Sequence, residues 1–282
     1  MSYECCICNA AASDPQIALV HSNVRAFAAE AFAVWRCPSC RSIHSRDEAD
    51  LAPYYAKYPF FKQQLNGLLR AGYRRLTRRL RRAGLAVGQS VIDYGCGSGL
   101  LVQYLNEQGF NAIGYDPYSA AHGDKSCLER RYDMVIAQDV IEHAADPRAV
   151  LATLDSLAAP GAAIAIGTPN ASGIDLSRPA KFIHPLHQPY HRHILSIEAL
   201  RNAGQSLGWQ LERYYPTPYT NMPVLSLPFL HHYMRQFDGT IDTLFDMPLA
   251  SAKLWLNPKT YALLAAGYFL CDDADVVAIF RK

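Results

Sequence analysis

The chain has 282 residues, of which 50% are hydrophobic and 18% are charged, and its formal net charge is +2. This composition excludes a disordered or collagen-like chain, and the small charge gives no global argument for a nucleic-acid partner. The longest late apolar run, residues 261–271, is about half of the roughly 20 residues that a membrane-spanning helix needs, and no signal-peptide pattern opens the chain. We therefore expect a soluble cytoplasmic protein without a membrane span, built as one large domain or as a medium domain with a smaller appendage.

Five of the eight cysteines lie within the first forty residues. Cys5 and Cys8 form one C-x-x-C pair, and Cys37 and Cys40 form a second pair after an interval of 28 residues. Each pair places two thiolates on a tight turn, and two such turns can build a tetrahedral zinc site. A disulfide framework is not expected in a protein without a leader, so we predict that these four cysteines hold a structural zinc ion.

The zinc ribbon is expected to cover residues 1–50, with short strands at 17–20 and 31–35. So few apolar residues form little core of their own, and a metal ion can replace that core. Cys6 is left over, either as a bystander thiol or as a competitor of Cys5 for the metal. Reduced cysteines without a metal are the alternative interpretation.

Residues 51–88 are predicted to form a helical linker or lid. Leu69, Leu76 and Leu80 share one helix face, and the other faces carry seven arginines: Arg70, Arg74, Arg75, Arg78, Arg79, Arg81 and Arg82. Such a stretch is either a solvated helix face that covers a sheet or a surface for an anionic partner such as RNA or a membrane surface. An aromatic group before it indicates interdomain packing or a lid over a ligand: Tyr54, Tyr55, Tyr58, Phe60 and Phe61.

A glycine-rich loop at residues 95–99 follows a predicted strand at 90–94 and precedes a predicted helix at 100–108. Glycines in a turn between strand and helix let the backbone approach a ligand closely. Asp93 precedes this loop by two positions. A second strand at 112–115 ends in Asp116, which is 23 residues after Asp93 and is placed to accept the hydroxyl groups of a ribose.

Strands and helices continue to alternate after this point, with strands at 132–137 and 162–167 around a helix at 147–157. This alternation predicts an α/β fold with a doubly wound, mostly parallel sheet. A helix at 195–207 with Ser196 as its N-cap, and a closing antiparallel hairpin of strands 210–215 and 275–280, are expected to complete it.

This part of the chain resembles the class I S-adenosylmethionine-dependent methyltransferases. The resemblance lies in V-I-D-Y-G-C-G-S-G at 91–99, G-Y-D-P at 114–117, Y-D-M-V-I-A-Q-D-V-I-E-H at 132–143, P-G at 160–161 and T-P-N at 168–170. With the ribbon, the chain is similar to bacterial small-molecule methyltransferases of sugar and natural-product pathways.

The resemblance implies that Asp93 and the glycines hold the methionine end of the cofactor, that Asp116 binds its ribose, and that Gln138 and Asp139 line the pocket beside the sulfonium. The expected cofactor site is therefore Asp93, Gly95, Cys96, Gly97, Gly99, Asp116, Pro117, Gln138 and Asp139. Asp133 follows Asp116 by only 17 positions, so the family's third strand is expected to be very short or missing and the adenine contacts stay open.

Candidates for a base lie at residues 184–193, past the strand that ends near Asn170. This segment should lie at the carboxyl edge of the sheet, where ligands bind. We predict His187, His191 and Tyr190 as the catalytic candidates, with packing, an exposed loop or a second metal site as alternatives. The pair Glu142-His143 has two interpretations, a structural one and assistance to a metal.

A long insertion at residues 217–273 separates the two strands of the closing hairpin, and long insertions are often functional. We predict that it forms helices that cap a substrate with apolar parts or that make a homodimer interface. The cofactor-binding core is then formed by 89–216 and closed by a last strand within 274–282.

The leading functional hypothesis is methyl transfer from S-adenosylmethionine to an oxygen, nitrogen or carbon atom of a small molecule. An RNA-base methyltransferase that uses the ribbon and the arginine-rich helix is the alternative, although the charge disfavours it. A scaffold or sensor that binds the cofactor without turnover is the non-enzymatic alternative. A dehydrogenase is disfavoured because Leu100 stands where a dinucleotide fingerprint has its third glycine.

Overall fold

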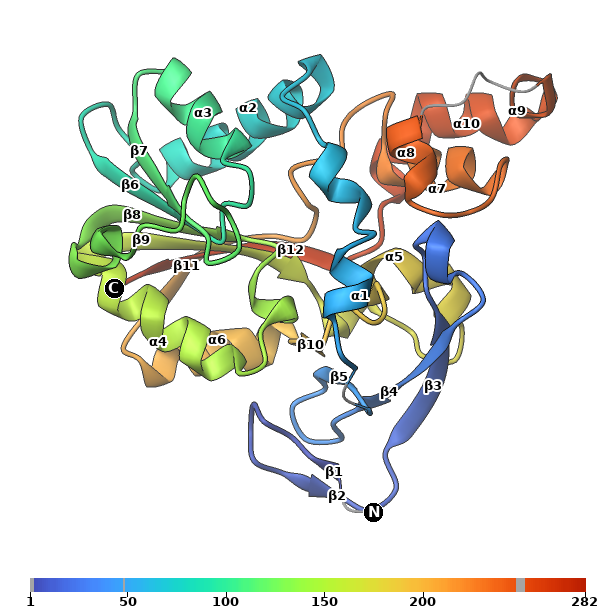
Figure 1. Ribbon diagram of the computed structural model, residues 1–282, viewed down its shortest axis with the longest axis horizontal. Helices are drawn as coiled ribbons and strands as arrows, with labels where there is room; N and C mark the ends of the chain where they lie inside the picture. The colour runs from blue at the N-terminus through green and yellow to red at the C-terminus, as the bar shows by residue number, and fades with distance from the viewer. Residues whose placement is uncertain (1–2, 48, 247–251) are drawn as a thin grey trace.

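The structure is a computed structural model, and it describes residues 3–47, 49–246 and 252–282. A six-stranded sheet with the order β11-β12-β9-β8-β6-β7 lies at its centre (Figure 1). β6, β7, β8 and β9 run parallel, and β12 runs antiparallel to both of its neighbours. The strands are β6 (Ser90–Tyr94), β7 (Asn111–Tyr115), β8 (Tyr132–Gln138), β9 (Ala158–Pro169), β11 (Gln210–Tyr215) and β12 (Asp275–Arg281). The predicted doubly wound, mostly parallel sheet and its closing hairpin are confirmed.

Helices cover both faces of this sheet, as Figure 1 shows. α2 (Gly67–Arg82) and α3 (Leu100–Glu107) lie on one face, and α4 (Pro147–Leu157) and α6 (Ile197–Ser206) lie on the other. Successive strand residues point to opposite faces, so Val91 packs in the core under α2 and α3 while Ile92 packs in the core under α4 and α6. Burial on both faces explains why these strands are continuous apolar runs in the sequence.

The connection between β7 and β8 contains one short 3-10 helix, η3 (Lys125–Glu129), and no strand among its residues, all of which the structure describes. The expectation that the family's third strand is very short or missing is therefore confirmed. β7 is the edge of the sheet for this reason.

The linker differs in part from its prediction. Its helical character is divided among α1 (Ala52–Tyr55), η2 (Pro59–Lys62) and α2, since prolines begin new short elements before the long helix. Arg79 does not lie on a solvated face: it is 4% exposed, donates to the carbonyl oxygen of Thr217 and lies over the ring of Tyr215. The buried face of α2 is therefore wider than its leucines indicate.

The N-terminal strands pack against the rest of the chain. β3 (Gln16–His21), β4 (Ala31–Arg36) and β5 (Ile43–Ser45) form a sheet with β10 (His193–Ile194) in the order β10-β5-β4-β3, and β1 (Tyr3–Glu4) pairs with β2 (Ala11–Ala12). Both strands expected in the ribbon are present. Arg36 donates to the carbonyl oxygens of Ala171 and Ile174, which lie beyond β9. The N-terminal module therefore shares its sheet and its core with residues of the methyltransferase-like part.

The insertion between β11 and β12 forms helices beyond one end of the sheet (Figure 1). They are α7 (Leu227–Arg235), α8 (Asp242–Asp246), α9 (Ala252–Leu256), α10 (Pro258–Ala266) and the 3-10 helix η7 (Gly267–Leu270), and residues 247–251 lie outside the described part. We call these helices the cap. The helical nature of the insertion is confirmed, whereas its role as a cap or a homodimer interface stays a prediction. None of the described helices has the length and apolar character that crossing a bilayer requires.

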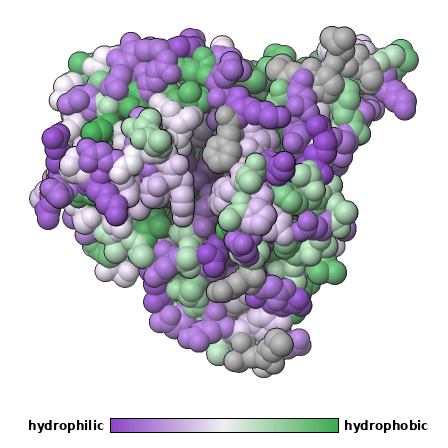
Figure 2. Space-filling model, in the orientation of Figure 1, coloured by the Kyte–Doolittle hydropathy of each residue, from purple (hydrophilic) through white to green (hydrophobic). Residues whose placement is uncertain are grey.

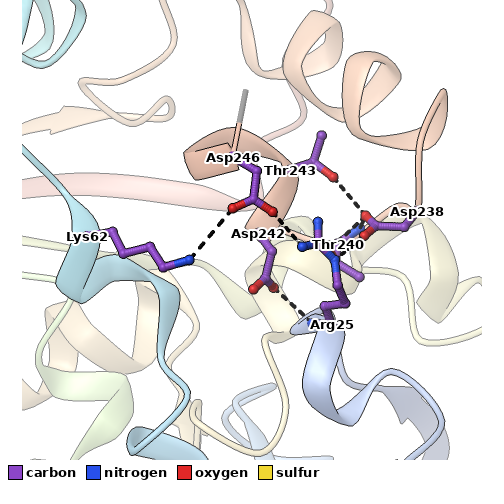
Figure 3. Close-up of polar contacts among 7 residues, drawn as sticks. All are labelled: Arg25, Lys62, Asp238, Thr240, Asp242, Thr243 and Asp246. Atoms are coloured by element: carbon purple, nitrogen blue, oxygen red, sulfur yellow. Dashed lines mark hydrogen bonds and ion pairs between the residues drawn. The ribbon is translucent and has the colours of Figure 1, made fainter. Parts of the chain in front are cut away.

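The cap is tied to the N-terminal module through Arg25 of η1 (Arg25–Phe27), as Figure 3 shows. Its guanidinium group donates to Asp238 and Asp246 at 2.5 Å each, and its backbone N–H donates to Asp242 at 2.9 Å. Lys62 of η2 approaches Asp246 at 3.7 Å from the other side. Three segments that are far apart in the sequence therefore meet in one ionic group.

Candidate active site

The glycine loop connects β6 to α3 with a backbone that side chains would disfavour. Gly95, Gly97 and Gly99 have φ angles of 77°, 55° and 77°, which lie in the left-handed region. The N–H groups of Gly95 and Cys96 both donate to the carbonyl oxygen of Tyr115, at 2.7 and 3.1 Å. The loop is thereby held against the end of β7.

Asp116, directly after β7, is fixed by two backbone donors. Its Oδ2 accepts from the N–H of Gly97 at 2.9 Å, and its Oδ1 accepts from the N–H of Tyr118 at 2.8 Å. The carboxylate therefore lies at the glycine loop, and Pro117 lies in the turn that it stabilises. The ring of His122 packs so closely on Gly99 that a Cβ at that glycine would lie 2.2 Å from Nε2.

Gln138 and Asp139 leave the carboxyl end of β8 beside this loop. Asp139 has a φ of 56°, and its N–H donates to the carbonyl oxygen of Gly167 at 2.9 Å. The side chain of Gln138 lies against Gly167, where a Cβ would be only 2.1 Å from Oε1. The absence of a side chain at Gly167 thus leaves room for the amide group of Gln138.

Carboxyl groups with raised pKa values meet at this edge of the sheet. Burial, with the charge of Asp116, raises the pKa of Asp93 to about 8, and burial raises the pKa of Asp139 to about 6. Burial, with the charge of Asp139, raises the pKa of Asp275 to about 7. The side chain of Asp139 is crowded by the surrounding chain yet keeps an exposed surface, so a ligand can reach its carboxyl group. A cationic ligand would stabilise the ionised forms of all these groups.

The surface is hollowed at this position. Figure 2 shows a hollow between the lobe that holds the glycine loop and the segment of α1 and η2, with hydrophilic residues along it. The carboxyl ends of the parallel strands are directed toward α1 in Figure 1. The glycine backbone, the fixed carboxylate of Asp116 and the carboxyl groups that favour a cation together fit S-adenosylmethionine, which has ribose hydroxyls, an ammonium group and a sulfonium group.

A second group of side chains joins the turn after β8 to the segment of residues 184–193. Glu142, His143 and His191 each offer one ligand atom, and these atoms lie within 4.8 Å of one another. Glu142 is fully buried; its Oε2 accepts from the hydroxyl of Thr168 at 3.0 Å, and its Oε1 has no hydrogen-bond partner among the described residues. Burial, with the charges of Asp139 and Asp275, raises its pKa well above the ordinary value. An orphaned carboxylate oxygen beside two imidazoles fits a divalent cation.

His191 is prepared to act through Nε2. Its Nδ1 donates to the carbonyl oxygen of Pro185 at 2.7 Å, which leaves a lone pair on the other nitrogen. Burial, with His143, lowers the pKa of His191 well below its usual range. Burial likewise lowers the pKa of His143 to about 4, so both imidazoles are neutral at neutral pH.

His187 has a fixed tautomer. Asn23 donates its amide N–H to His184, so its Oδ1 must be the atom that accepts from Nδ1 of His187 at 2.5 Å. Nε2 of His187 then carries a lone pair, and it is buried without a hydrogen-bond partner among the described residues. Burial, with the neighbouring histidines, lowers the pKa of His187 well below its usual range.

Aromatic side chains enclose His187. The ring of Tyr190 stacks on it at 4.6 Å, and Tyr58 and Phe60 lie at 5.8 and 6.4 Å. Tyr190 is fully buried and donates its hydroxyl to the carbonyl oxygen of Tyr54, so its hydroxyl is already engaged. The aromatic group predicted in the linker thus packs around two of the three residues predicted to be catalytic.

The four histidines of residues 184–193 have four different neighbours. His184 stacks on His231 of the cap at 4.4 Å, His187 lies among the aromatic rings, and His191 contacts His143 at 4.8 Å. His193 meets His44 of the N-terminal module. The segment, which includes α5 (Ile183–Leu186), therefore connects the cap, the sheet edge and the ribbon.

The four predicted zinc ligands lie together in the N-terminal module. Cys5 and Cys40 approach to 3.5 Å, Cys8 and Cys37 approach to 3.7 Å, and all four sulfur atoms lie within 4.8 Å of one another. A tetrahedral zinc ion bound to four thiolates separates its sulfur ligands by roughly 3.8 Å. The cysteine arrangement therefore fits one zinc ion.

The sequence interpretation missed Asp275, which the fold brings to the site from β12. It named Tyr55 and Tyr58 of the linker as packing or lid residues and gave them no place in the catalytic group. The hydroxyl of Tyr55 lies 3.2 Å from Nδ1 of His143. The aromatic signal was visible in the sequence, but the sequence contains no signal that places Asp275 near Asp139.

The central sheet and its covering helices have the architecture of the class I S-adenosylmethionine-dependent methyltransferase fold. The sequence model of the methyltransferase domain family matches residues 65–214, which is more than half of the chain. The chain belongs to this family.

Curated relatives are ubiquinone biosynthesis O-methyltransferases. That of Rhodopseudomonas palustris (strain BisB18) is 29% identical over 140 residues, which cover 43% of this chain and 54% of the relative. That of Salmonella typhi is 26% identical over 155 residues, which cover 46% of this chain and 64% of the relative. The chain thus spans less than two thirds of the length of these relatives.

Solved structures are similar to this chain at low sequence identity. A chain in the complex between the Haloferax volcanii Trm112 methyltransferase activator and a methyltransferase has a TM-score of 0.50 at 12% identity, with 82% of this chain and 97% of that chain covered. The S-adenosylmethionine-dependent methyltransferase of Archaeoglobus fulgidus has a TM-score of 0.45 at 17% identity, with 81% and 99% covered.

Proposed function

We propose that the enzyme transfers a methyl group to a hydroxyl oxygen of a small organic molecule bound between the sheet edge and the cap. The observation that carries this proposal is the group Glu142, His143 and His191, of which the first two follow β8 shortly after Asp139. A divalent cation held there would lower the pKa of a hydroxyl group. The curated relatives are O-methyltransferases, which agrees with an oxygen acceptor.

S-adenosylmethionine supplies an electrophilic methyl group on a positively charged sulfur when it is bound. In the proposed site, Asp93, the glycine loop and Asp116 bind and orient the cofactor, and Gln138 and Asp139 line the position of the sulfonium. Transfer is an in-line displacement, so orientation and the exclusion of water contribute much of the rate.

His187 is proposed as the base that receives the proton of the acceptor hydroxyl at Nε2. Its lone pair is fixed by the hydrogen bond from Nδ1 to Asn23, and its lowered pKa keeps it neutral and able to accept a proton. Tyr190 is proposed to position His187 by stacking, since its own hydroxyl is engaged. His191 is proposed as a ligand of the cation through Nε2.

The aromatic walls support an acceptor with apolar parts. Tyr55, Tyr58 and Phe60 from the linker and Tyr190 surround the histidines, and the cap is joined to this group through Phe245, which lies 5.2 Å from Phe60. A ring or another apolar portion of a small molecule could pack here. Sugar and natural-product acceptors both meet this description.

The RNA alternative is weakened by the arrangement of the arginines on α2. Arg70 pairs with Glu107, Arg75 donates to the hydroxyl of Tyr268, and Arg79 is buried against Thr217. These side chains hold the sheet, the cap and the linker together. Exposed arginines remain at positions 74, 78, 81 and 82, so short RNAs belong among the acceptors in the activity assay.

Cys5, Cys8, Cys37 and Cys40 are proposed to hold a structural zinc ion. Four thiolates complete the tetrahedral coordination of zinc and leave no position for a substrate. Metal analysis of the purified protein should then find at least one equivalent of zinc, and Cys8→Ser should lower that content by one.

The function is tested by measuring S-adenosylhomocysteine release with panels of phenols, sugar hydroxyl compounds, amines and short RNAs. We expect turnover with a hydroxyl acceptor, loss of turnover after chelation with EDTA, and recovery on adding Mg²⁺ or Mn²⁺. His191→Ala should reduce turnover at least tenfold, whereas His184→Ala, whose ring stacks on the cap, should keep most of it.

Two outcomes would contradict the proposal. Turnover on an amine or RNA that is unaffected by chelation would exclude the cation and the acceptor class. Equal activity of His191→Ala and His184→Ala would remove His191 from the site.

A further inference from the structure

Three side chains that neither the proposed reaction nor the four-cysteine site uses lie together beside the latter. They are Cys6, His44 and His193, and their ligand atoms lie within 4.8 Å of one another. Cys6 follows β1, His44 belongs to β5 and His193 belongs to β10. The two histidines are direct partners across the antiparallel pair of β5 and β10, so their side chains share one face of that small sheet.

The ring of His44 is held in one orientation by its neighbours. It is 2% exposed, lies 4.7 Å from the ring of Trp35, and places Nε2 at 3.2 Å from the sulfur of Cys5. A thiolate sulfur that binds zinc accepts hydrogen bonds, so Nε2 of His44 carries the proton and Nδ1 carries the lone pair. His44 therefore presents a ligand atom on the side away from Cys5.

Two further donors converge on that nitrogen. Nδ1 of His193 lies 3.0 Å from Nδ1 of His44, and the sulfur of Cys6 lies 4.0 Å from the same atom. Two ring nitrogens at this distance share either a proton or a metal ion. A neutral His193 that donates its Nδ1–H accounts for the two nitrogens alone, whereas a metal ion can bind both nitrogens and the sulfur of Cys6.

The distances are close to those of a transition-metal site. Zinc binds imidazole nitrogen at about 2.0 Å and thiolate sulfur at about 2.3 Å, which separates tetrahedral ligand atoms by roughly 3.3 to 3.8 Å. The observed separations of 3.0 and 4.0 Å lie on either side of that range. One thiolate and two imidazoles are ligands that zinc accepts, and three protein ligands leave a fourth position open.

We propose that Cys6, His44 and His193 bind a second zinc ion next to the four-cysteine site. Cys6 is then neither a bystander nor a competitor of Cys5, because Cys5 faces Cys40 while Cys6 faces His44. The ion connects the turn that carries Cys6 to β10. Since His193 is two residues after His191, it also anchors the segment that carries the proposed catalytic histidines.

The proposal is tested by zinc analysis of the full chain after anaerobic reconstitution with zinc and removal of loosely bound metal. Cys6→Ser should contain one equivalent of zinc less than the wild type. Cys271→Ser is the matched control, because Cys271 is a half-buried cysteine outside both groups, and its zinc content should equal that of the wild type. Equal zinc contents in Cys6→Ser and the wild type would overturn the proposal.

A second measurement on the wild type avoids any folding defect of a variant. In the zinc-loaded protein, alkylation followed by mass spectrometry should modify Cys271 and spare Cys6, and Cys6 should react once the metal is removed. Alkylation of both cysteines at the same rate in the zinc-loaded protein would overturn the proposal. His191→Ala changes the proposed catalytic cation and leaves this zinc in place, so the two metal proposals fail separately.

Discussion

Asp93 combines a buried position with an ionisable group, and its replacement by asparagine tests the electrostatics of the cofactor site. Asp93 is 3% exposed at the end of β6, and burial together with the charge of Asp116 raises its pKa from 3.8 to about 8. Asparagine keeps the shape of the side chain and cannot ionise. The change therefore removes the titration and little else.

The sign follows from the two pKa values. Because the folded pKa is raised, the stabilising contribution is complete below the unfolded pKa of 3.8 and is lost as the pH rises toward 8. At pH 7 the folded protein keeps this carboxyl protonated while the unfolded chain ionises it, at a cost of about 4 kcal/mol. The cofactor-free Asp93→Asn variant should therefore be more stable than the wild type at pH 7 by up to about 4 kcal/mol, and similar to it near pH 4.

Urea unfolding of both proteins at several pH values between 4 and 8, without cofactor, measures this difference. Asp133→Asn is a suitable control at the start of β8, where hydrogen bonds from Ser90 hold the pKa of Asp133 below its usual range. Asp133→Asn should therefore destabilise the protein at neutral pH, an effect opposite in sign to that of Asp93→Asn. If the free energies of unfolding of Asp93→Asn and the wild type change in parallel with pH, the reasoning is refuted. If the more stable variant binds the cofactor more weakly, the wild type keeps a destabilising carboxyl group because cofactor binding needs it.

Four further predictions concern the cofactor site and the cap. Asp139 should ionise near pH 6, so the preference for S-adenosylmethionine over S-adenosylhomocysteine, whose sulfur is uncharged, should rise between pH 5 and 7.5. Calorimetry measures this preference. Asp139→Asn should abolish the rise, and an unchanged rise in that variant would contradict the prediction. Asp116→Ala should weaken cofactor binding at least tenfold, about 1.4 kcal/mol, and unchanged affinity would count against the assigned ribose site. Gly99→Ala should lower the free energy of unfolding by more than the roughly 1–2 kcal/mol expected from a positive φ alone. Gly88→Ala, where φ is positive and the surrounding space is open, should lower it only by the amount due to φ. Equal losses of free energy in the two variants would exclude the contact with the neighbouring imidazole. Arg25→Ala should accelerate limited proteolysis within the cap without changing cleavage of the sheet, and an unchanged digestion pattern would exclude the anchoring role seen in Figure 3.

Much of the central fold could be predicted from the sequence because its signals are local. The strand 90–94 and the helix 147–157 have the predicted bounds. The strand is an apolar run flanked by glycine, and the helix begins with a proline, so a few residues are enough to recognise each of them. The glycine loop and Asp116 were predicted for the same reason, because each directly follows an apolar strand.

The rest depends on contacts between distant segments. Arg79 is buried by Thr217, which follows it by 138 residues, so helix periodicity alone places it on a solvated face. β10 has two residues, too few for any periodic pattern, yet it joins the N-terminal sheet and aligns His193 with His44. The four histidines of one segment could be recognised as important, but their four separate neighbours follow only from the tertiary fold.

The two parts of the site have opposite electrostatic requirements, and the fold meets both by burial. Beside the glycine loop, burial raises the pKa values of carboxyl groups such as Asp93 and Asp139, so they ionise readily only when a cation reaches them. Among the aromatic rings, burial lowers the pKa values of His187 and His191, so their lone pairs stay free at neutral pH. In the proposed reaction, a cationic methyl donor is therefore favoured on the acidic side, and the proposed base His187 stays unprotonated on the other side. The same low polarity thus supports both halves of the proposed site.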